Sequence, residues 1–240
     1  MTDTASVSQC ILSKNAPVLF FDTCSLLDLV RDPTRECFSS DQYETAIRLL
    51  RKVDGEEGYL HVVVNSQVHH ELNDNFSSVC EDSENKLDKL NKKIAFLQRV
   101  YVSIGATVSQ NLSFSKNDFS QYGKNIYDSF IGKSITYKEE DDVAKNKAFD
   151  RSRFCKAPAK KGKQELKDCI VIELYLFLAQ HLRSIGYSNR IVFISSNTKD
   201  YASDVRGGIL HPELKDDFDS VKMEYASNYG LAERMLFPPC

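Results

Sequence analysis

The sequence predicts a three-layer α/β/α domain with a mainly parallel central sheet. Short apolar runs without polar alternation are typical of strands that are buried on both faces. Such runs occur at residues 17–21, 59–65 and 190–197, and residues 221–227 are expected to form a last strand. Because helical patterns lie between these runs, the strands should belong to parallel β-α-β units, which place helices on both faces of a sheet.

Helical periodicity fills most of the intervals between the predicted strands. Ser66 is a candidate N-cap for the helix that follows the second strand. The polar stretch 105–160 shows no clear pattern, and we expect it to be an insertion or a helical subdomain within one domain that spans residues 1–240. Apolar spacing and composition predict helices at residues 41–53, 66–75, 84–104 and 164–186.

The composition is that of an ordinary globular protein, with 42% hydrophobic and 27% charged residues. A net charge of −3 does not by itself indicate a nucleic-acid binder, although local patches decide such binding more than the total does. The seven cysteines never form a C-x-x-C pair, which gives no support to a zinc-ribbon or thioredoxin-like site and indicates reduced thiols. The sequence shows no signal peptide, and its longest apolar stretch is too short for a bilayer, so we expect a cytoplasmic protein without a membrane partner.

Polar residues stand where the chain leaves the predicted strands. Asp22 follows the first strand directly, Glu71 lies six residues after the second, and Asp168 begins the helix before the strand at 190–197. Ligands of open parallel sheets gather beyond the carboxyl ends of the strands, so these acids are expected to face one cleft, together with Asn197 or Asp200. Converging carboxylates repel one another unless a cation intervenes, and oxygen ligands suit Mg²⁺ or Mn²⁺.

Each of these acids also has a purely structural interpretation. Asp22 is a favoured residue for a helix N-cap, Glu71 is of a type found on solvated helix surfaces, and Asp168 complements a helix dipole. Glu173 lies roughly 140° round the helix from Asp168 and is therefore left out of the site. Glu165, three residues before Asp168, lies nearer the same face and is a reserve candidate.

Two histidines and two serines also lie near these acids in the sequence. Adjacent helical side chains diverge by about 100°, so His69 and His70 are poorly placed to bind one ion together, and we expect them to pack or to lie on the surface. Ser25 and Ser195 are placed to orient a water or a phosphate, with capping or loop roles as the alternative.

Four stretches of the sequence together resemble the PIN domain family of metal-dependent ribonucleases. They read VLFFDTCSLLDL, VNSQVHHELNDN, KKGKQELKDCIVIEL and VFISSNTKDY, and they follow the family's order between residues 18 and 201. The chain is most similar to a larger bacterial branch often described as a domain of unknown function. This resemblance implies a five-stranded parallel sheet, of which the third strand is not located in the sequence.

The resemblance also implies a catalytic site. It makes Asp22, Glu71 and Asp168 metal-binding acids that activate a water for attack on RNA. The fourth family position falls in residues 195–201, where Asn197 replaces a charged residue and Asp200 supplies a carboxylate three residues later. Either residue is a candidate metal ligand, and Asp200 joins the three acids as a candidate catalytic residue.

A basic run extends over residues 143–167, into the first turn of the helix predicted at 164–186. Phosphate contacts supply most non-specific affinity for nucleic acids, so Lys160, Lys161 and Lys163 are candidate contacts to the RNA backbone. The alternative is a solvated loop. RNA is the expected substrate, with single-stranded DNA as an alternative, and homo-oligomerisation stays open. The family resemblance alone implies an antitoxin or a companion defence protein as a partner.

Two other functions compete with that of a metal-dependent endoribonuclease. A haloacid-dehalogenase-like phosphatase also places an aspartate after its first strand, but it needs a second one two residues later, where this chain has Cys24. The other alternative is a catalytically degenerate PIN-like module that binds RNA or protein. Asn197, in place of an acid, keeps that alternative open.

Overall fold

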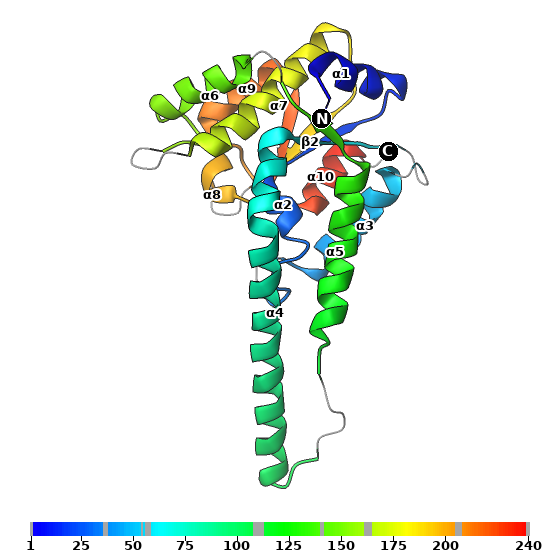
Figure 1. Ribbon diagram of the computed structural model, residues 1–240, viewed down its shortest axis with the longest axis vertical. Helices are drawn as coiled ribbons and strands as arrows, with labels where there is room; N and C mark the ends of the chain where they lie inside the picture. The colour runs from blue at the N-terminus through cyan, green and yellow to red at the C-terminus, as the bar shows by residue number, and fades with distance from the viewer. Residues whose placement is uncertain are drawn as a thin grey trace.

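The fold is described from a computed structural model (Figure 1). It describes residues 2–35, 38–53, 55, 59–107, 113–139, 142–160, 165–204 and 208–238.

Five parallel strands form one sheet, in the order β3-β2-β1-β4-β5, which confirms the predicted α/β fold. The strand that could not be located in the sequence is β3. It lies within the stretch 105–160 and pairs with β2, with Val63 opposite Ile135. The strands are β1 Val18–Phe21, β2 His61–Asn65, β3 Ile135–Tyr137, β4 Ile191–Ile194 and β5 Met223–Ala226.

Helices cover both faces of this sheet, as expected for three layers. Successive side chains of a strand point to opposite faces. On β1, Phe20 stacks on Tyr175 of α7 with ring centroids 4.5 Å apart, whereas Phe21 packs against Phe130 of α5 and Tyr229 of α10. The helices of the described part are α1 Thr4–Ser13, α2 Thr23–Leu27, α3 Ser40–Val53, α4 Ser66–Ser103, α5 Lys116–Lys133, α6 Val143–Arg153, α7 Leu166–Ser184, α8 Thr198–Tyr201, α9 Pro212–Ser220 and α10 Tyr229–Leu236.

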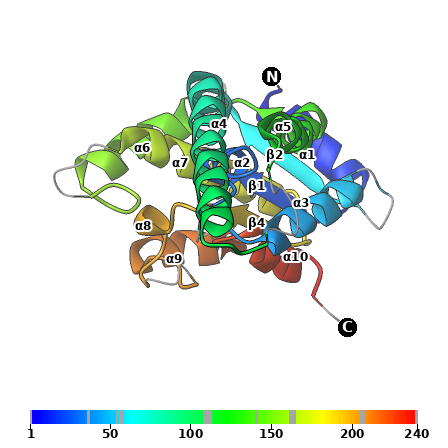
Figure 2. The same cartoon turned by 90° about the horizontal axis from the view of Figure 1, so that it is seen from below.

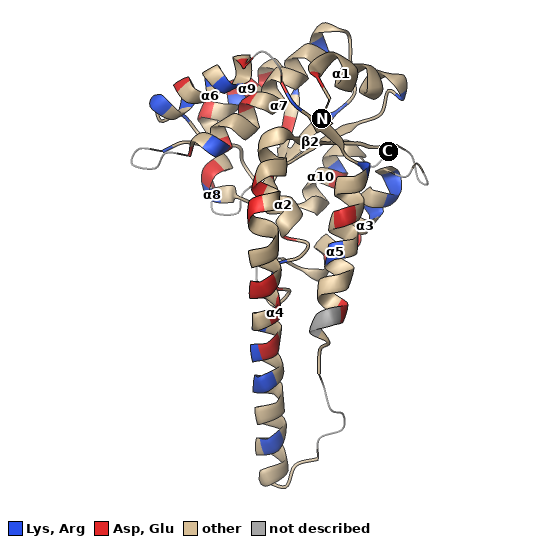
Figure 3. Ribbon diagram, in the orientation of Figure 1, with Lys and Arg blue, Asp and Glu red and all other residues tan. Residues whose placement is uncertain are grey.

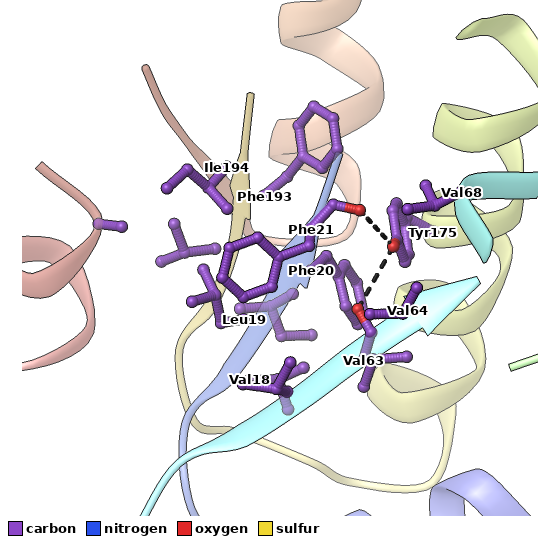
Figure 4. Packing of buried hydrophobic residues seen from close by; sticks show 14 of the residues in the cluster. Val18, Leu19, Phe20, Phe21, Val63, Val64, Val68, Tyr175, Phe193 and Ile194 are labelled. Carbon is purple, nitrogen blue, oxygen red and sulfur yellow. Dashed lines mark hydrogen bonds between the residues drawn. The ribbon is translucent and has the colours of Figure 1, made fainter. Parts of the chain in front are cut away.

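Tyr175 ties two strand ends together beside the predicted site (Figure 4). Its hydroxyl donates to the carbonyl of Phe21 at 2.6 Å and accepts the backbone N–H of Asn65 at 3.2 Å. Strands β1 and β2 end at these two residues. The spacing between the chain segments that carry Asp22 and Glu71 is therefore held by a buried side chain.

Helix α4 is a single helix of 38 residues, which joins the predicted helical stretches at 66–75 and 84–104. Residues 76–83 contain neither Gly nor Pro, and the helix runs through them without a break. Its N-cap is Asn65 rather than Ser66, since the Asn65 side chain accepts the N–H of Val68 at 3.0 Å. Figure 1 shows that α4 projects far beyond the sheet, and Figures 1 and 2 show that α5 runs beside it.

The stretch 105–160, expected to be an insertion or a helical subdomain, contributes α5, β3 and α6 to the described structure. None of the helices in the described part of the chain is both long enough and apolar enough to cross a lipid bilayer.

Candidate active site

Four predicted acids lie just beyond the carboxyl ends of three neighbouring strands. Strand β1 pairs with β2 on one side and with β4 on the other, so the segments that follow these strands meet at one edge of the sheet. Asp22 follows β1, Glu71 lies in the second turn of α4 after β2, and Asp200 lies in α8 after β4. Asp168 is in the first turn of α7, which precedes β4.

Three carboxylates form the tightest group at this edge. One oxygen each from Glu165, Asp168 and Asp200 lies within 4.8 Å of the other two. Glu165 was only a reserve candidate from the sequence, and it belongs to this group because it stands at the N-cap position of α7, three residues before Asp168. Three hard oxygen donors at this separation fit one divalent cation of the Mg²⁺ or Mn²⁺ type.

Asp22 is buried, with 2% of its surface exposed. It occupies the N-cap position of α2 but makes no side-chain capping hydrogen bond, so the capping interpretation does not account for it. Instead, the Ser195 hydroxyl donates to Asp22 Oδ2 at 2.6 Å. Burial raises the pKa of Asp22 to about 6, the nearby charge of Glu71 adds to the rise, and the hydrogen bond from Ser195 opposes it.

Both carboxylate oxygens of Glu71 accept hydrogen bonds. Thr23 Oγ1 donates to one oxygen at 2.7 Å, and Gln67 Nε2 donates to the other at 2.9 Å. These bonds fix the carboxylate against α2 and α4, which is unlike a freely solvated helix residue. Carboxylate oxygens keep further lone pairs when they accept one bond each, so this arrangement orients Glu71 without blocking a cation.

The other acids of the site all affect the pKa of Asp168. Burial raises its pKa to about 8, and the charges of Asp22, Glu71, Asp200 and Glu165, in decreasing order, raise it further. Five carboxylates therefore act on one another at this edge of the sheet. Such repulsion is relieved by protonation or by a bound cation.

Asn197 and Asp200 contact each other, since Asn197 Nδ2 donates to Asp200 Oδ2 at 2.6 Å. Asp200 belongs to the group with Glu165 and Asp168. The Asn197 amide thus orients the Asp200 carboxylate. The backbone N–H of Asn197 also donates to Ser195 Oγ at 3.2 Å, which joins it to the Asp22 contact.

Lys160, a candidate RNA-backbone contact, lies against the acidic group. Its ammonium is 2.9 Å from Asp200 Oδ1 and also donates to the carbonyl of Lys199. The two other lysine candidates, Lys161 and Lys163, lie outside the described residues. Of the remaining basic run, Arg151 is buried in ion pairs with Glu173 and Asp217.

Thr23 and Gln67, which donate to Glu71, are not among the site residues predicted from the sequence. Thr23 carries no signal that links it to Glu71, whereas Gln67 stands four residues before Glu71 at helical spacing. Ser25 accepts the N–H of Ser196 at 3.0 Å and so braces the turn after β4.

The two histidines considered with the acids lie apart from this group. His70 is 3.6 Å from Asp74 and His69 is 3.4 Å from Asn73, contacts made within α4.

A family model of the PIN domain matches residues 19–201, and the chain belongs to the PIN domain family. The fold and the acidic edge agree with this family, whose members are generally nucleases that use divalent metals. No curated protein and no solved structure matches the chain.

Proposed function

We propose that this protein is a Mg²⁺- or Mn²⁺-dependent endoribonuclease that hydrolyses RNA phosphodiester bonds. The observation that carries the proposal is the convergence of carboxylates from distant chain segments, with Glu165, Asp168 and Asp200 within 4.8 Å of one another. Such a concentration of like charge costs stability unless it serves a bound cation. The raised pKa values of Asp22 and Asp168 support the same interpretation.

The donor set fits a hard divalent cation. Asp22, Asp168, Glu165 and Asp200 would hold it, and Glu71 would complete the acidic wall. When bound, such an ion polarises the phosphodiester and lowers the pKa of an attacking water. Cysteine or histidine ligands, which would suit zinc, are not part of the group among the described residues.

The chain's own polar residues hold this arrangement in place. Ser195 and Asn197 brace Asp22 and Asp200, while Thr23 and Gln67 brace Glu71. Preorganised carboxylates need no rearrangement when charge develops in the reaction. The Lys160 ammonium, 2.9 Å from Asp200, supplies positive charge at the rim where a phosphate would approach.

The proposal extends to a cytoplasmic effector of a toxin–antitoxin or phage-defence kind, with RNA as its substrate and an antitoxin or companion defence protein as its partner. This extension rests on family resemblance. The competing function is a degenerate PIN-like module that binds RNA or protein. It is favoured by one observation, the amide of Asn197 where the family pattern has an acid.

The test is a cleavage assay with labelled RNAs and single-stranded DNA in Mn²⁺, in Mg²⁺ and in EDTA. Asp22→Asn keeps the side-chain shape and removes the charge, and Asp74→Asn on the exposed side of α4 is the matched control. We expect cleavage of RNA that needs metal, is lost in Asp22→Asn and survives in Asp74→Asn. Absence of cleavage in every condition would favour the binding module, and cleavage by Asp22→Asn would contradict the site.

A further inference from the structure

The distal part of α4, residues 89–103 (here called the stalk), carries positive charge without balancing acids. Between residues 89 and 117 the sequence has five Lys or Arg residues and no Asp or Glu, although the chain as a whole has a net charge of −3. Figure 3 shows this basic character along the projecting end of α4. The basic side chains of the stalk are all exposed: Lys89, Lys92, Lys93 and Arg99.

An aromatic ring stands among these cations. Phe96 is 58% exposed, and Lys92, Lys93 and Arg99 lie one helical turn before or after it. Exposed aromatic rings that are interleaved with basic residues are the elements from which single-stranded nucleic-acid sites are built, since the ring stacks on a base while the cations contact phosphates.

The stalk and the acidic site share one face of α4. Lys89 lies 18 residues after Glu71, which is five full turns, and Phe96 lies 25 residues after Glu71, about 20° short of seven turns. The opposite face is the buried one, because Leu87, 3% exposed, lies about 160° from Glu71. A ligand that touches Glu71 and follows this face therefore reaches Lys89 and Phe96.

A hollow lies along the same face between the two regions. Its lining includes Ser78, Asp82 and Lys86 of α4, together with Arg31, Asp32 and Arg35. These three cations already pair with acids: Arg31 and Arg35 with Asp28, and Lys86 with Asp82. The cations of the hollow are thus balanced by acids, and the unbalanced positive charge begins only at the stalk.

We propose that the stalk binds a single strand of RNA that extends from the acidic site along α4. Lys89, Lys92 and Lys93 contact its phosphates, and Phe96 stacks on one base. This inference rests on the proposed function, of which it names the substrate class and the path. The shared helix face favours RNA over a membrane or a protein partner, because only a substrate strand has reason to contact both regions at once.

The helix sets the length of RNA that can reach both regions. At 1.5 Å per residue, Phe96 lies about 38 Å along α4 from Glu71. A strand stacked at about 3.4 Å per nucleotide needs on the order of eleven nucleotides to cover that distance. An RNA of about 25 nucleotides therefore reaches both regions, while one of about six does not.

The test measures binding of fluorescein-labelled, unstructured single-stranded RNA to the full chain in EDTA, where hydrolysis plays no part. The first variant is Lys92→Glu/Lys93→Glu. Its control, Lys14→Glu/Lys222→Glu, makes the same charge change at exposed lysines that precede β1 and β5, at the opposite edge of the sheet. We expect the Kd of the long RNA to rise about tenfold or more in the stalk variant and to stay within about twofold in the control.

Two further measurements separate the contribution of the lysines to RNA binding from that of Phe96. The slope of log K against log salt should fall by about 0.7 for each lysine lost from a phosphate contact. Phe96→Ala should raise the Kd of the long RNA about fivefold or more, and Val102→Ala, an exposed position on another side of α4, should not. The short RNA, which covers only one region at a time, should bind the wild type more weakly than the long RNA does.

Crosslinking of RNA that carries 4-thiouridine maps the contact in the wild-type protein, which removes any dependence on how variants fold. Crosslinks within residues 89–103 support the proposal. Unchanged long-RNA binding in the stalk variants, or binding of anionic phosphatidylserine vesicles in place of RNA, overturns it. Binding at the stalk without cleavage in metal would reject the nuclease and keep the stalk, whereas cleavage with unaltered binding in the stalk variants would do the reverse.

Discussion

Ser195 and Asp22 are 173 residues apart in the chain, and the serine hydroxyl donates to the aspartate at 2.6 Å. The register of the sheet explains this contact. Phe21 of β1 pairs with Ile194 of β4, so the next residue of each strand emerges beside the other. The Asp22 N–H continues the ladder by donating to the carbonyl of Ile194 at 3.0 Å. A parallel pair of strands thus places a hydroxyl on a buried carboxylate.

We expect Ser195→Ala to weaken both stability and cleavage. The change leaves a buried carboxylate with one fewer donor, which costs about 1–3 kcal/mol of the free energy of unfolding. It also removes the group that orients Asp22, so RNA cleavage should fall about tenfold or more. Urea denaturation and the cleavage rate measure the two effects. Ser196→Ala, whose side chain makes no such contact with Asp22, is the control and should behave like the wild type.

The positions of Asp22, Glu71 and Asp200 were predictable because each lies within six residues after a predicted strand. Four residues, VLFF, mark β1 as buried, and the acid at its end has to lie at the carboxyl edge of the sheet. The same logic places Asp200 after β4. The sequence alone does not show that β1, β2 and β4 are neighbours, and the strand order β3-β2-β1-β4-β5 establishes it.

Other parts could not be predicted because their signals are not local. Strand β3 has only three residues, Ile135–Tyr137, at the edge of the sheet, and only its pairing with β2 distinguishes it from a loop. Thr23 contacts Glu71 because α2 packs on α4, which no spacing in the sequence reveals. Glu165 was placed near Asp168 by helical spacing, but its proximity to Asp200 depends on how α7 and α8 meet.

The stability of the metal-free protein should fall as the pH rises. In the folded state the pKa values of Asp22 and Asp168 are raised to about 6 and about 8, so both groups keep protons that the unfolded chain loses near pH 4. The folded state then binds more protons than the unfolded state, and the free energy of unfolding decreases between about pH 4 and pH 8. Thermal denaturation in EDTA across this range measures the slope.

Asp168→Asn is the variant that isolates this effect. It removes the carboxyl with the largest rise, so its stability should depend less on pH and should exceed that of the wild type at pH 8. Asp74→Asn, an exposed change on α4, should retain the wild-type slope. A wild-type stability that is flat or rises between pH 5 and 8 in EDTA would show that the acids do not repel one another as described.

Lys160 offers a measure of the charge within the site. Its ammonium lies 2.9 Å from Asp200, in a position to offset part of the negative charge and to repel an incoming cation. The pair is partly exposed, so Lys160→Met should increase the apparent affinity for Mn²⁺ only about two- to fivefold. The same change should lower the melting temperature in EDTA, because Asp200 then repels its neighbours without compensation.

A thermal-shift titration with Mn²⁺ measures both quantities for Lys160→Met. Lys156→Met, an exposed lysine of the same segment, is the control and should leave the Mn²⁺ affinity unchanged. Equal Mn²⁺ affinities in wild type and Lys160→Met would mean that the ion binds away from Asp200.

Two glycines of α5 test how closely this helix approaches the segment after α2. A Cβ at Gly123 would overlap the carbonyl oxygen of Leu29, which is a backbone atom, whereas a Cβ at Gly132 would meet no atom within 4 Å. Gly123→Ala therefore forces the helix and the backbone apart, and we expect it to lower the free energy of unfolding by about 1–3 kcal/mol. Gly132→Ala gains the helix propensity of alanine without a clash and should raise the free energy of unfolding by about 0.5–1 kcal/mol.

Urea denaturation of the two variants compares them within one helix, so that the difference between them reports the contact with Leu29. If both changes stabilise the protein, the close approach of α5 to Leu29 does not exist in solution.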